Sequence, residues 1–224
     1  MPNFNIIKAN NPENTFRVSK ILADFDVKPE HSCEQFKGNI EYPENWNIGV
    51  IVGNSGTGKS TIARELYSEN IVTNFEYVNK SVIDDMPKED IDKITKMFYS
   101  VGFGSVPSWL KPYSVLSNGE KMRVDLARAL LEKDFIVFDE FTSVVDRQVA
   151  QTACIAIHKA IKNTNKKFIA VSCHYDILDW LQPDWVFDTN KMKSFFGTAH
   201  VPQNSLKSEN VREKSGQYLN VITI

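Results

Sequence analysis

Eight consecutive residues, Gly53 to Ser60, read G-N-S-G-T-G-K-S and match the pattern G-x-x-x-x-G-K-S. In this pattern the glycines let the backbone turn tightly, so that its N–H groups point at one spot, and the positive end of the following helix favours an anion there. The lysine reaches the β- and γ-phosphates of a nucleotide, and the serine hydroxyl binds Mg²⁺. The residues that we expect to bind phosphates are Gly53, Asn54, Ser55, Gly56, Thr57, Gly58, Lys59, Ser60 and Thr61.

The elements on either side suit this chemistry. Ile48–Val52, just before the pattern, is a short apolar and mostly β-branched run, which is typical of a buried strand. Residues 61–67, just after it, have the apolar spacing of a helix. A strand, a glycine loop and a helix in this order separate a phosphate site from a glycine-rich turn with a chance lysine. We therefore predict a P-loop.

A second motif combines an apolar run with two acids. Phe135–Phe138 predicts a buried strand, and it is followed by Asp139 and Glu140. This is the Walker B pattern, in which the aspartate holds Mg²⁺ directly or through water. Glu140, one residue beyond the strand, is placed to act as a general base toward an attacking water. A strand that simply runs out into an acidic turn is the alternative, and the P-loop upstream weighs against it.

The segment Leu116–Glu120 opens a predicted helix over residues 117–132, because Ser117 can cap it and Glu120 stands three residues further on. Its letters L-S-N-G-E, followed by R-V-D-L-A-R-A-L, resemble the signature motif and helix of ATP-binding cassette (ABC) ATPases. Ser143–Asp146 is similar to the D-loop of that family, and His174, after a predicted strand, is similar to its switch histidine. Together with the P-loop and Walker B, five motifs follow the family's order.

The resemblance implies an α/β fold of the P-loop NTPase type, with a mixed, mainly parallel sheet, an N-terminal antiparallel β portion and a helical subdomain. In that family two cassettes dimerise head to tail and hold ATP between the P-loop of one and the signature motif of the other. Carried over, Ser117 and Gly119 would reach the γ-phosphate of ATP bound to a second copy of the chain. Glu140 would be the catalytic base, His174 would contact the γ-phosphate and hold the water in line, and Asp146 would lie at the dimer seam.

An aromatic side chain ahead of the P-loop stacks on adenine in this family. We expect Phe25 to do so here, and Phe36 is the alternative. Either ring can equally belong to the hydrophobic core. The role of segment 180–185, which has Trp at both ends, likewise has two interpretations. Trp is favoured at binding hot spots, but a packed turn that closes the sheet edge is the more common use.

Three departures separate the chain from the cassettes of transporters. The family has a glutamine loop whose Gln ligates Mg²⁺, but no Gln stands between residues 35 and 148 of this sequence. A nearby acid, Asp84 or Asp85, is our hypothesis for its role on the metal. The span of residues 61–115 is short for a transporter cassette, and Phe141 stands where the family's proline follows the Asp-Glu pair. These features favour a role outside transport.

The leading hypothesis is a soluble ABC-type ATPase that binds Mg-ATP between two head-to-tail protomers and hydrolyses it to drive a partner. The chain also resembles a bacterial or phage group of stand-alone cassettes, some of which adjoin acetyltransferase-like domains. Nucleic acid and an acetyltransferase-like protein are therefore the partners considered besides the second copy, and a membrane partner is not expected. Two alternatives stay open: an ATP-binding subunit of an ABC transporter, and a nucleotide-gated regulatory or scaffold module with little turnover.

The chain has 224 residues and a net charge of −2, and its length allows one generous α/β domain or two small ones. This charge gives no sign of a basic surface that coats nucleic acid. No apolar run reaches about 18 residues, and the start lacks a signal-peptide pattern, so a cytoplasmic protein is expected. The three cysteines lie far apart, which is typical of free thiols. We divide the chain into an ATPase domain at residues 1–200, with a reduced helical subdomain at about 85–125, and a polar tail at 201–224.

The apolar patterns predict further elements around the motifs. Strands are expected at residues 15–27, 36–42, 75–82, 168–172, 186–187 and 193–196. Helices are expected at residues 88–99, 147–161 and, for a turn or two, 175–181. Loops are expected at residues 29–38 and 101–113.

Overall fold

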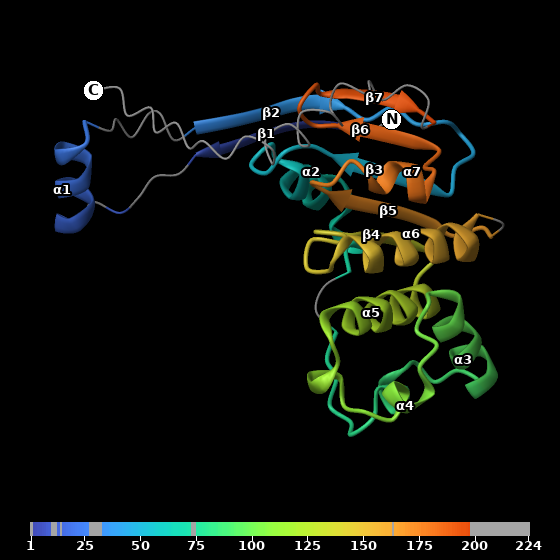
Figure 1. Ribbon diagram of the computed structural model, residues 1–224. Coiled ribbons are helices and arrows are strands. Elements are labelled where there is room, and N and C mark those ends of the chain that lie inside the picture. The colour runs from blue at the N-terminus through green and yellow to red at the C-terminus, as the bar shows by residue number, and fades with distance from the viewer. Residues whose placement is uncertain are drawn as a thin grey trace.

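The computed structural model describes residues 2–9, 13, 15–26, 33–72, 75–162 and 164–197. A five-stranded sheet forms its centre, a two-stranded ribbon projects from it, and a helical lobe lies beyond one edge (Figure 1). The predicted tail at residues 201–224 lies outside the described residues. Among the helices of the described part, none has both the length and the apolar character needed to cross a membrane.

The central sheet has the strand order β4-β5-β3-β6-β7. β3 (Ile48–Val52), β4 (Phe135–Phe138), β5 (Lys167–Ser172) and β6 (Trp185–Asp188) run parallel, whereas β7 (Lys193–Phe196) is antiparallel to β6. Every residue of β3 and β6 is buried, which explains why their sequences are apolar without alternation. The predicted mixed, mainly parallel sheet is confirmed.

Alternate residues of the strands belong to two separate hydrophobic clusters. Val50 of β3 packs with α6 (Arg147–Ile161) and α7 (Ile177–Leu181), whereas Ile51 packs with α2 (Lys59–Tyr67) and the ribbon. The sheet is thus covered on both faces, as parallel strands require. Because parallel strands end at the same edge, the segments that follow β3, β4 and β5 meet there. Those segments carry the P-loop, the Walker B acids and the switch-like histidine.

The ribbon consists of β1 (Asn3–Ala9) and β2 (Cys33–Asn39), paired antiparallel over their whole length. β1 was not predicted. The predicted strand at 36–42 is wrong in its bounds, because pairing with β1 shifts it toward the N-terminus and into the predicted loop at 29–38. Residues 29–32 of that loop lie outside the described residues.

The predicted strand at residues 15–27 is wrong, because Phe16–Asp24 forms helix α1. Thr15 caps it, with its hydroxyl accepting the N–H of Val18 at 3.3 Å. The apolar side chains recur at helical rather than strand spacing, and none of the residues of α1 is buried. The helix lies beyond the outer end of the ribbon, away from the sheet (Figure 1).

The helical lobe contains α3 (Ile91–Ser100), the short α4 (Val106–Trp109) and α5 (Asn118–Glu132). Short 3-10 turns supplement them: η2 (Ser68–Asn70) after α2, and η3 (Val82–Asp85) and η4 (Tyr113–Val115) within the lobe. The predicted strand at 75–82 is wrong. Phe75 and Tyr77 alternate because both rings pack against the guanidinium of Arg128 in α5, at 4.7 and 5.1 Å, and not because a strand pairs there.

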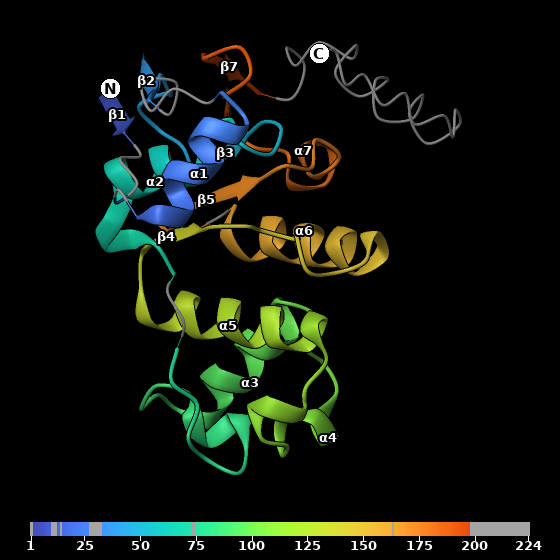
Figure 2. The same cartoon turned by 90° about the vertical axis from the view of Figure 1, so that its left-hand side faces the viewer.

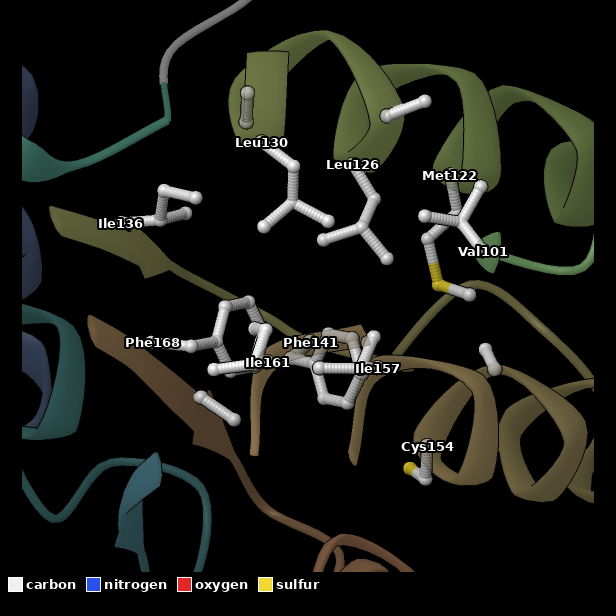
Figure 3. Packing of buried hydrophobic residues seen from close by; sticks show 14 of the residues in the cluster. Val101, Met122, Leu126, Leu130, Ile136, Phe141, Cys154, Ile157, Ile161 and Phe168 are labelled. Atoms are coloured by element: carbon white, nitrogen blue, oxygen red, sulfur yellow. The ribbon is translucent and has the colours of Figure 1, made fainter. Parts of the chain in front are cut away.

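One hydrophobic cluster joins the lobe to the sheet. Leu126 and Leu130 of α5 point toward Phe141, which follows β4, and toward Phe168 of β5 (Figure 3). All four side chains are at most 2% exposed. α5 lies alongside α6, and α3 and α4 lie beyond α5 on the side away from the sheet (Figure 2).

Candidate nucleotide site

The P-loop leaves β3 at Val52 and ends at Gly58, the N-cap of α2. Gly58 has a φ of 83°, in the left-handed region, and a Cβ there would lie 2.6 Å from Cε1 of Phe36 in β2. Gly53 is held as closely, because its Cβ would lie 2.1 Å from Oγ1 of Thr189. Both positions therefore require glycine. The first N–H groups of α2 open at the edge where the parallel strands end.

Hydrogen bonds within the P-loop stabilise its turn. The Asn54 carbonyl accepts a hydrogen bond from the Lys59 Nζ at 2.7 Å and another from the Thr57 Oγ1 at 2.8 Å. Thr57 Oγ1 also lies 2.6 Å from Oγ1 of Thr189. Burial lowers the pKa of the Lys59 ammonium, an effect that the neighbouring Cys173 and Asp139 oppose. An ammonium has three donors, so Lys59 can keep its bond to Asn54 and still bind a phosphate.

Ser60 and Asp139 form a pair of hard oxygen groups. The Ser60 Oγ donates to Oδ1 of Asp139 at 2.8 Å, and Arg64 approaches Oδ2 at 3.4 Å. A serine hydroxyl and one carboxylate are the protein ligands that Mg²⁺ takes when phosphates and waters supply the rest. Their position at the start of α2, where the helix favours anions, fits a magnesium triphosphate.

Glu140 follows Asp139 directly and is exposed, with its N–H donating to Oδ1 of Asp139 at 3.0 Å. Glu140 and Thr142 have φ values of 53° and 67°, so two left-handed non-glycine residues lie within three positions. Phe141, between them, is fully buried and donates its N–H to the Val171 carbonyl at 2.8 Å. A proline at this position would lack that donor. The hydrogen bond and the buried ring hold the strained turn that presents Glu140.

These groups open into one cavity of about 400 Å³, which is within the size range of ligand pockets. The residues that line it are Lys8, Glu34, Phe36, Ser55, Gly56, Gly58, Lys59, Ser60, Thr61, Asp139, Glu140, Ser143, Val171, Ser172 and Cys173. The structure thus brings most of the predicted phosphate residues together with both Walker B acids. Gly53, Asn54 and Thr57 do not line the cavity but shape the loop that does.

The signature-like residues lie elsewhere, at the start of α5. Ser117 caps the helix in a capping box: its Oγ accepts the N–H of Glu120 at 3.3 Å, and its own N–H donates to the Glu120 carboxylate at 2.9 Å. A Cβ on Gly119 would lie 2.9 Å from Cγ1 of Val149 in α6, so this glycine lets the two helices approach. Neither Ser117 nor Gly119 lines the phosphate cavity of its own chain.

Glu120 also connects the start of α5 to α4. Its carboxylate accepts a hydrogen bond from the Ser108 Oγ at 2.7 Å. Hydrogen bonds from Ser108 and Ser117 hold the pKa of Glu120 below its usual range. The carboxylate is therefore committed to bracing the helix start in its charged form.

His174 and Asp146 follow their strands as predicted in order, but neither lines the cavity. The His174 N–H donates to the Ser172 Oγ at 3.1 Å. Cys173, the residue before His174, does line the cavity. Asp146 is the N-cap of α6 and accepts the N–H groups of residues 148 and 149, both at 3.0 Å. The catalytic role of His174 stays a prediction.

The two aromatic candidates for adenine occupy different places. Phe25 ends α1 with 70% of its surface exposed and does not line the cavity. Phe36, on β2, lines the cavity and packs against Gly58. Adenine stacking stays a prediction, and the structure leaves Phe36 as the ring beside the P-loop.

Asp84 and Asp85 are used within the helical lobe. The Asp84 carboxylate accepts a short hydrogen bond from the Ser81 hydroxyl, and Asp84 does not line the cavity. Asp85 is buried and accepts hydrogen bonds from Asn79, whose amide Nδ2 lies 2.7 Å away. The structure does not bring either acid to the Ser60–Asp139 pair.

The segment 180–185 is a packed turn in this structure. Trp185 is fully buried, and a Cβ on Gly49 would lie 2.2 Å from its ring. Trp180 is half-buried under the guanidinium of Arg147, which lies 5.2 Å from the ring centroid. Arg147 in turn donates to Asp176 at 2.8 Å.

Sequence reasoning missed the contribution of the ribbon and of the strand end at β5. Lys8 and Glu34 are opposite each other in the β1–β2 register and both line the cavity. Cys173, next to the switch-like His174, lines it too, as does Ser143 of the D-loop-like motif. The alternation of Phe4, Ile6 and Lys8 was the available signal for β1.

No protein-family model and no curated protein matches the sequence significantly. Solved structures, in contrast, match its fold. A dimeric post-hydrolysis structure of the ATP-binding cassette MJ0796 bound to ADP and Pi matches with a TM-score of 0.54 and 14% identity, over 69% of this chain and 87% of that chain. The cassette cbiO1 from Clostridium perfringens, part of the ABC transporter complex cbiONQ, gives 0.56 and 19%, over 81% and 86%. The ADP conformation of MJ1267, an ATP-binding cassette of an ABC transporter, gives 0.56 and 16%, over 82% and 92%.

The chain has the fold of an ATP-binding cassette. At these identities the likeness shows the fold alone. The cavity at the P-loop lies at the carboxyl ends of the parallel strands, which is where open α/β sheets bind ligands.

Proposed function

We propose that the chain binds Mg-ATP in the cavity at the P-loop, together with the signature-like residues of a second copy, and hydrolyses it. The observation that carries this proposal is the shared cavity of Lys59, Ser60, Asp139 and Glu140. A phosphate-binding helix start, a hard-oxygen pair and an exposed carboxylate are the groups that hydrolysis of a phosphoanhydride needs.

Within this proposal each residue has one task. The N–H groups at the start of α2 and the Lys59 ammonium bind the β- and γ-phosphates. Ser60 and Asp139 would hold Mg²⁺, which supplies neutralisation of the phosphate charge. Glu140 accepts the proton of the attacking water, and Phe36 rather than Phe25 lies beside the nucleotide.

The second copy enters because half of the expected site is missing from the first. Ser117 and Gly119 lie at a preformed helix start that does not reach the cavity of its own chain. A helix start is a ready anion site, so a second copy placed head to tail would close the cavity over the γ-phosphate. The similar MJ0796 cassette was solved as a dimer, which supports a self-dimer here.

We also propose what ATP binding and hydrolysis accomplish. ATP closes the dimer and hydrolysis opens it, and the difference in binding free energy acts on a partner. Nucleic acid and an acetyltransferase-like protein are the partners that we would test first. Several similar structures, among them cbiO1 and MJ1267, belong to ABC transporters, but the lack of Gln between residues 35 and 148 weighs against that role here.

The substitution Glu140→Gln tests this function. It removes the base but keeps size and polarity, so we expect ATP hydrolysis to fall about 10²- to 10⁴-fold while binding persists. Size-exclusion chromatography with light scattering should then show a dimer with Mg-ATP and a monomer without it. Glu65→Gln, on an exposed part of α2 outside the cavity, is the matched control. If Glu140→Gln stays monomeric with saturating ATP, the shared-site proposal is wrong.

A further inference from the structure

The ribbon has one face turned to the P-loop. In the register of β1 and β2 the inner pairs are Phe4 with Gly38, Ile6 with Phe36, and Lys8 with Glu34. Phe4 and Phe36 are buried, whereas the outer-face residues Asn5, Ile7 and Lys37 are exposed. Because side chains alternate along a strand, Lys8 and Glu34 lie on the same face as Phe36.

Phe36 fixes where this face meets the phosphate site. Its ring lies so close to Gly58 that no side chain fits between them. Two residues along a strand span about 7 Å, so the Lys8–Glu34 pair lies about that far along the ribbon from Phe36. Both residues line the same cavity as Lys59 and Ser60. A nucleotide with its phosphates at Lys59 and Ser60 would have to extend its nucleoside through this same cavity.

Lys8 and Glu34 are exposed and are not used elsewhere in the described part of the chain. Neither forms an ion pair or a side-chain hydrogen bond with another residue that the structure describes. Directly opposed residues of an antiparallel pair have Cβ atoms about 5 Å apart. The ribbon therefore offers one donor and one acceptor side by side.

We propose that Lys8 and Glu34 read the base of the nucleotide and make the site selective for adenine. The inference rests on the proposed function. Adenine presents its N6 amino group, a donor, beside N7, an acceptor, so Glu34 can accept from the first and Lys8 can donate to the second. Guanine presents two acceptors, O6 and N7, at the same edge, which leaves the Glu34 carboxylate without a donor. A carboxylate facing the phosphates would be repelled, which also assigns Glu34 to the nucleoside.

The test separates base from phosphate binding. Dissociation constants are measured for ATP, GTP, 2′-deoxyATP and inorganic triphosphate, with the full chain and with Lys8→Met and Glu34→Met. We expect each substitution to weaken ATP binding about three- to tenfold and to leave triphosphate binding unchanged. Glu34→Met should also narrow the preference for ATP over GTP. Lys37→Met, on the outer face of β2, is the matched control and should change none of these values.

Each other outcome has one meaning. A full chain that binds neither ATP nor triphosphate contradicts the proposed function itself. Normal ATP binding by both variants overturns only the role of the ribbon. A loss in Glu34→Met that disappears with 2′-deoxyATP assigns Glu34 to the ribose and overturns base reading. A parallel loss of triphosphate binding in Lys8→Met makes that residue a phosphate ligand and likewise overturns it.

Discussion

The strand-end edge of the sheet and the start of α5 carry the two halves of the predicted site in opposite states. At the edge, Lys59, Ser60 and Asp139 line an open cavity, and their hydrogen bonds leave the Lys59 ammonium with further donors for a ligand. At α5, Ser117 and Glu120 already satisfy one another, and Ser108 adds a further hydrogen bond. The first region is built to receive a ligand, and the second is a rigid surface built to be presented. On the proposed function, a second copy of the chain completes the site.

Mixing two inactive variants tests that division most strongly. Lys59→Ala removes the phosphate-binding cation, and Ser117→Arg blocks the helix start, so each alone should lose about 10²- to 10³-fold in ATP turnover. In an equal mixture of the two chains, half of the dimers are mixed and each has one intact site. We expect the mixture to regain about a quarter of the full turnover, measured by phosphate release.

The control mixture combines Lys59→Ala with the double variant Lys59→Ala, Ser117→Arg, because no intact site can form in it. Turnover should stay at the level of Lys59→Ala. If the first mixture shows no more turnover than the control, the two regions do not cooperate between chains.

Substitution at Phe141 tests how much the packing and hydrogen bond of the turn after β4 contribute to stability. The Phe141 ring packs 5.8 Å from that of Phe138 and 5.6 Å from that of Phe168, and its N–H bonds the Val171 carbonyl. Phe141→Pro removes the ring and the donor, so we expect the free energy of unfolding to fall by about 3–5 kcal/mol, measured in urea. Phe141→Leu keeps the donor and should cost clearly less. Equal losses in the two variants would show that the hydrogen bond contributes nothing.

The sheet with its covering helix and the lobe differ in how much of them the sequence predicts. Ile48–Val52, Phe135–Phe138 and the helix at 147–161 have the predicted bounds, because each is a long or fully apolar run with clear limits. Residues 75–82 were predicted as a strand because Phe75 and Tyr77 alternate. Their partners are Arg128 and Tyr113, which lie far along the chain, and local periodicity cannot reveal such partners.

The site divides in a similar way. The phosphate residues belong to one continuous motif, so their meeting with Asp139 followed from strands that end at one edge. The pairing of Lys8 with Glu34 could not be predicted, because no short turn fixes the register of β1 and β2. Phe25 was chosen by its spacing before the P-loop, which says nothing about the helix that carries it away from the cavity.

A half-buried carboxylate in the lobe, that of Asp125, links Tyr77 to α5. Asp125 accepts hydrogen bonds from the hydroxyl groups of Tyr77 at 2.7 Å and Tyr113 at 2.8 Å, and the two rings stack with centroids 3.9 Å apart. Burial raises the pKa of Asp125, although both hydroxyl groups and Arg128 act in the opposite direction. The stability of this polar cluster should therefore respond to pH.

The smallest expected effect is the pH dependence of stability at Asp125. A carboxyl group whose pKa is raised in the folded state stabilises the fold while it is protonated, and that contribution is lost as the pH rises through the raised pKa. The melting temperature of the full chain should thus exceed that of Asp125→Asn most at the acid end, by the equivalent of about 1 kcal/mol, and the gap should shrink toward neutral pH. Asp134→Asn, at a fully exposed carboxylate whose pKa Lys166 lowers, should give the opposite slope. A difference in melting temperature that widens as the pH rises would mean that the hydroxyl groups and Arg128 outweigh burial. The charged form of Asp125 would then stabilise the lobe.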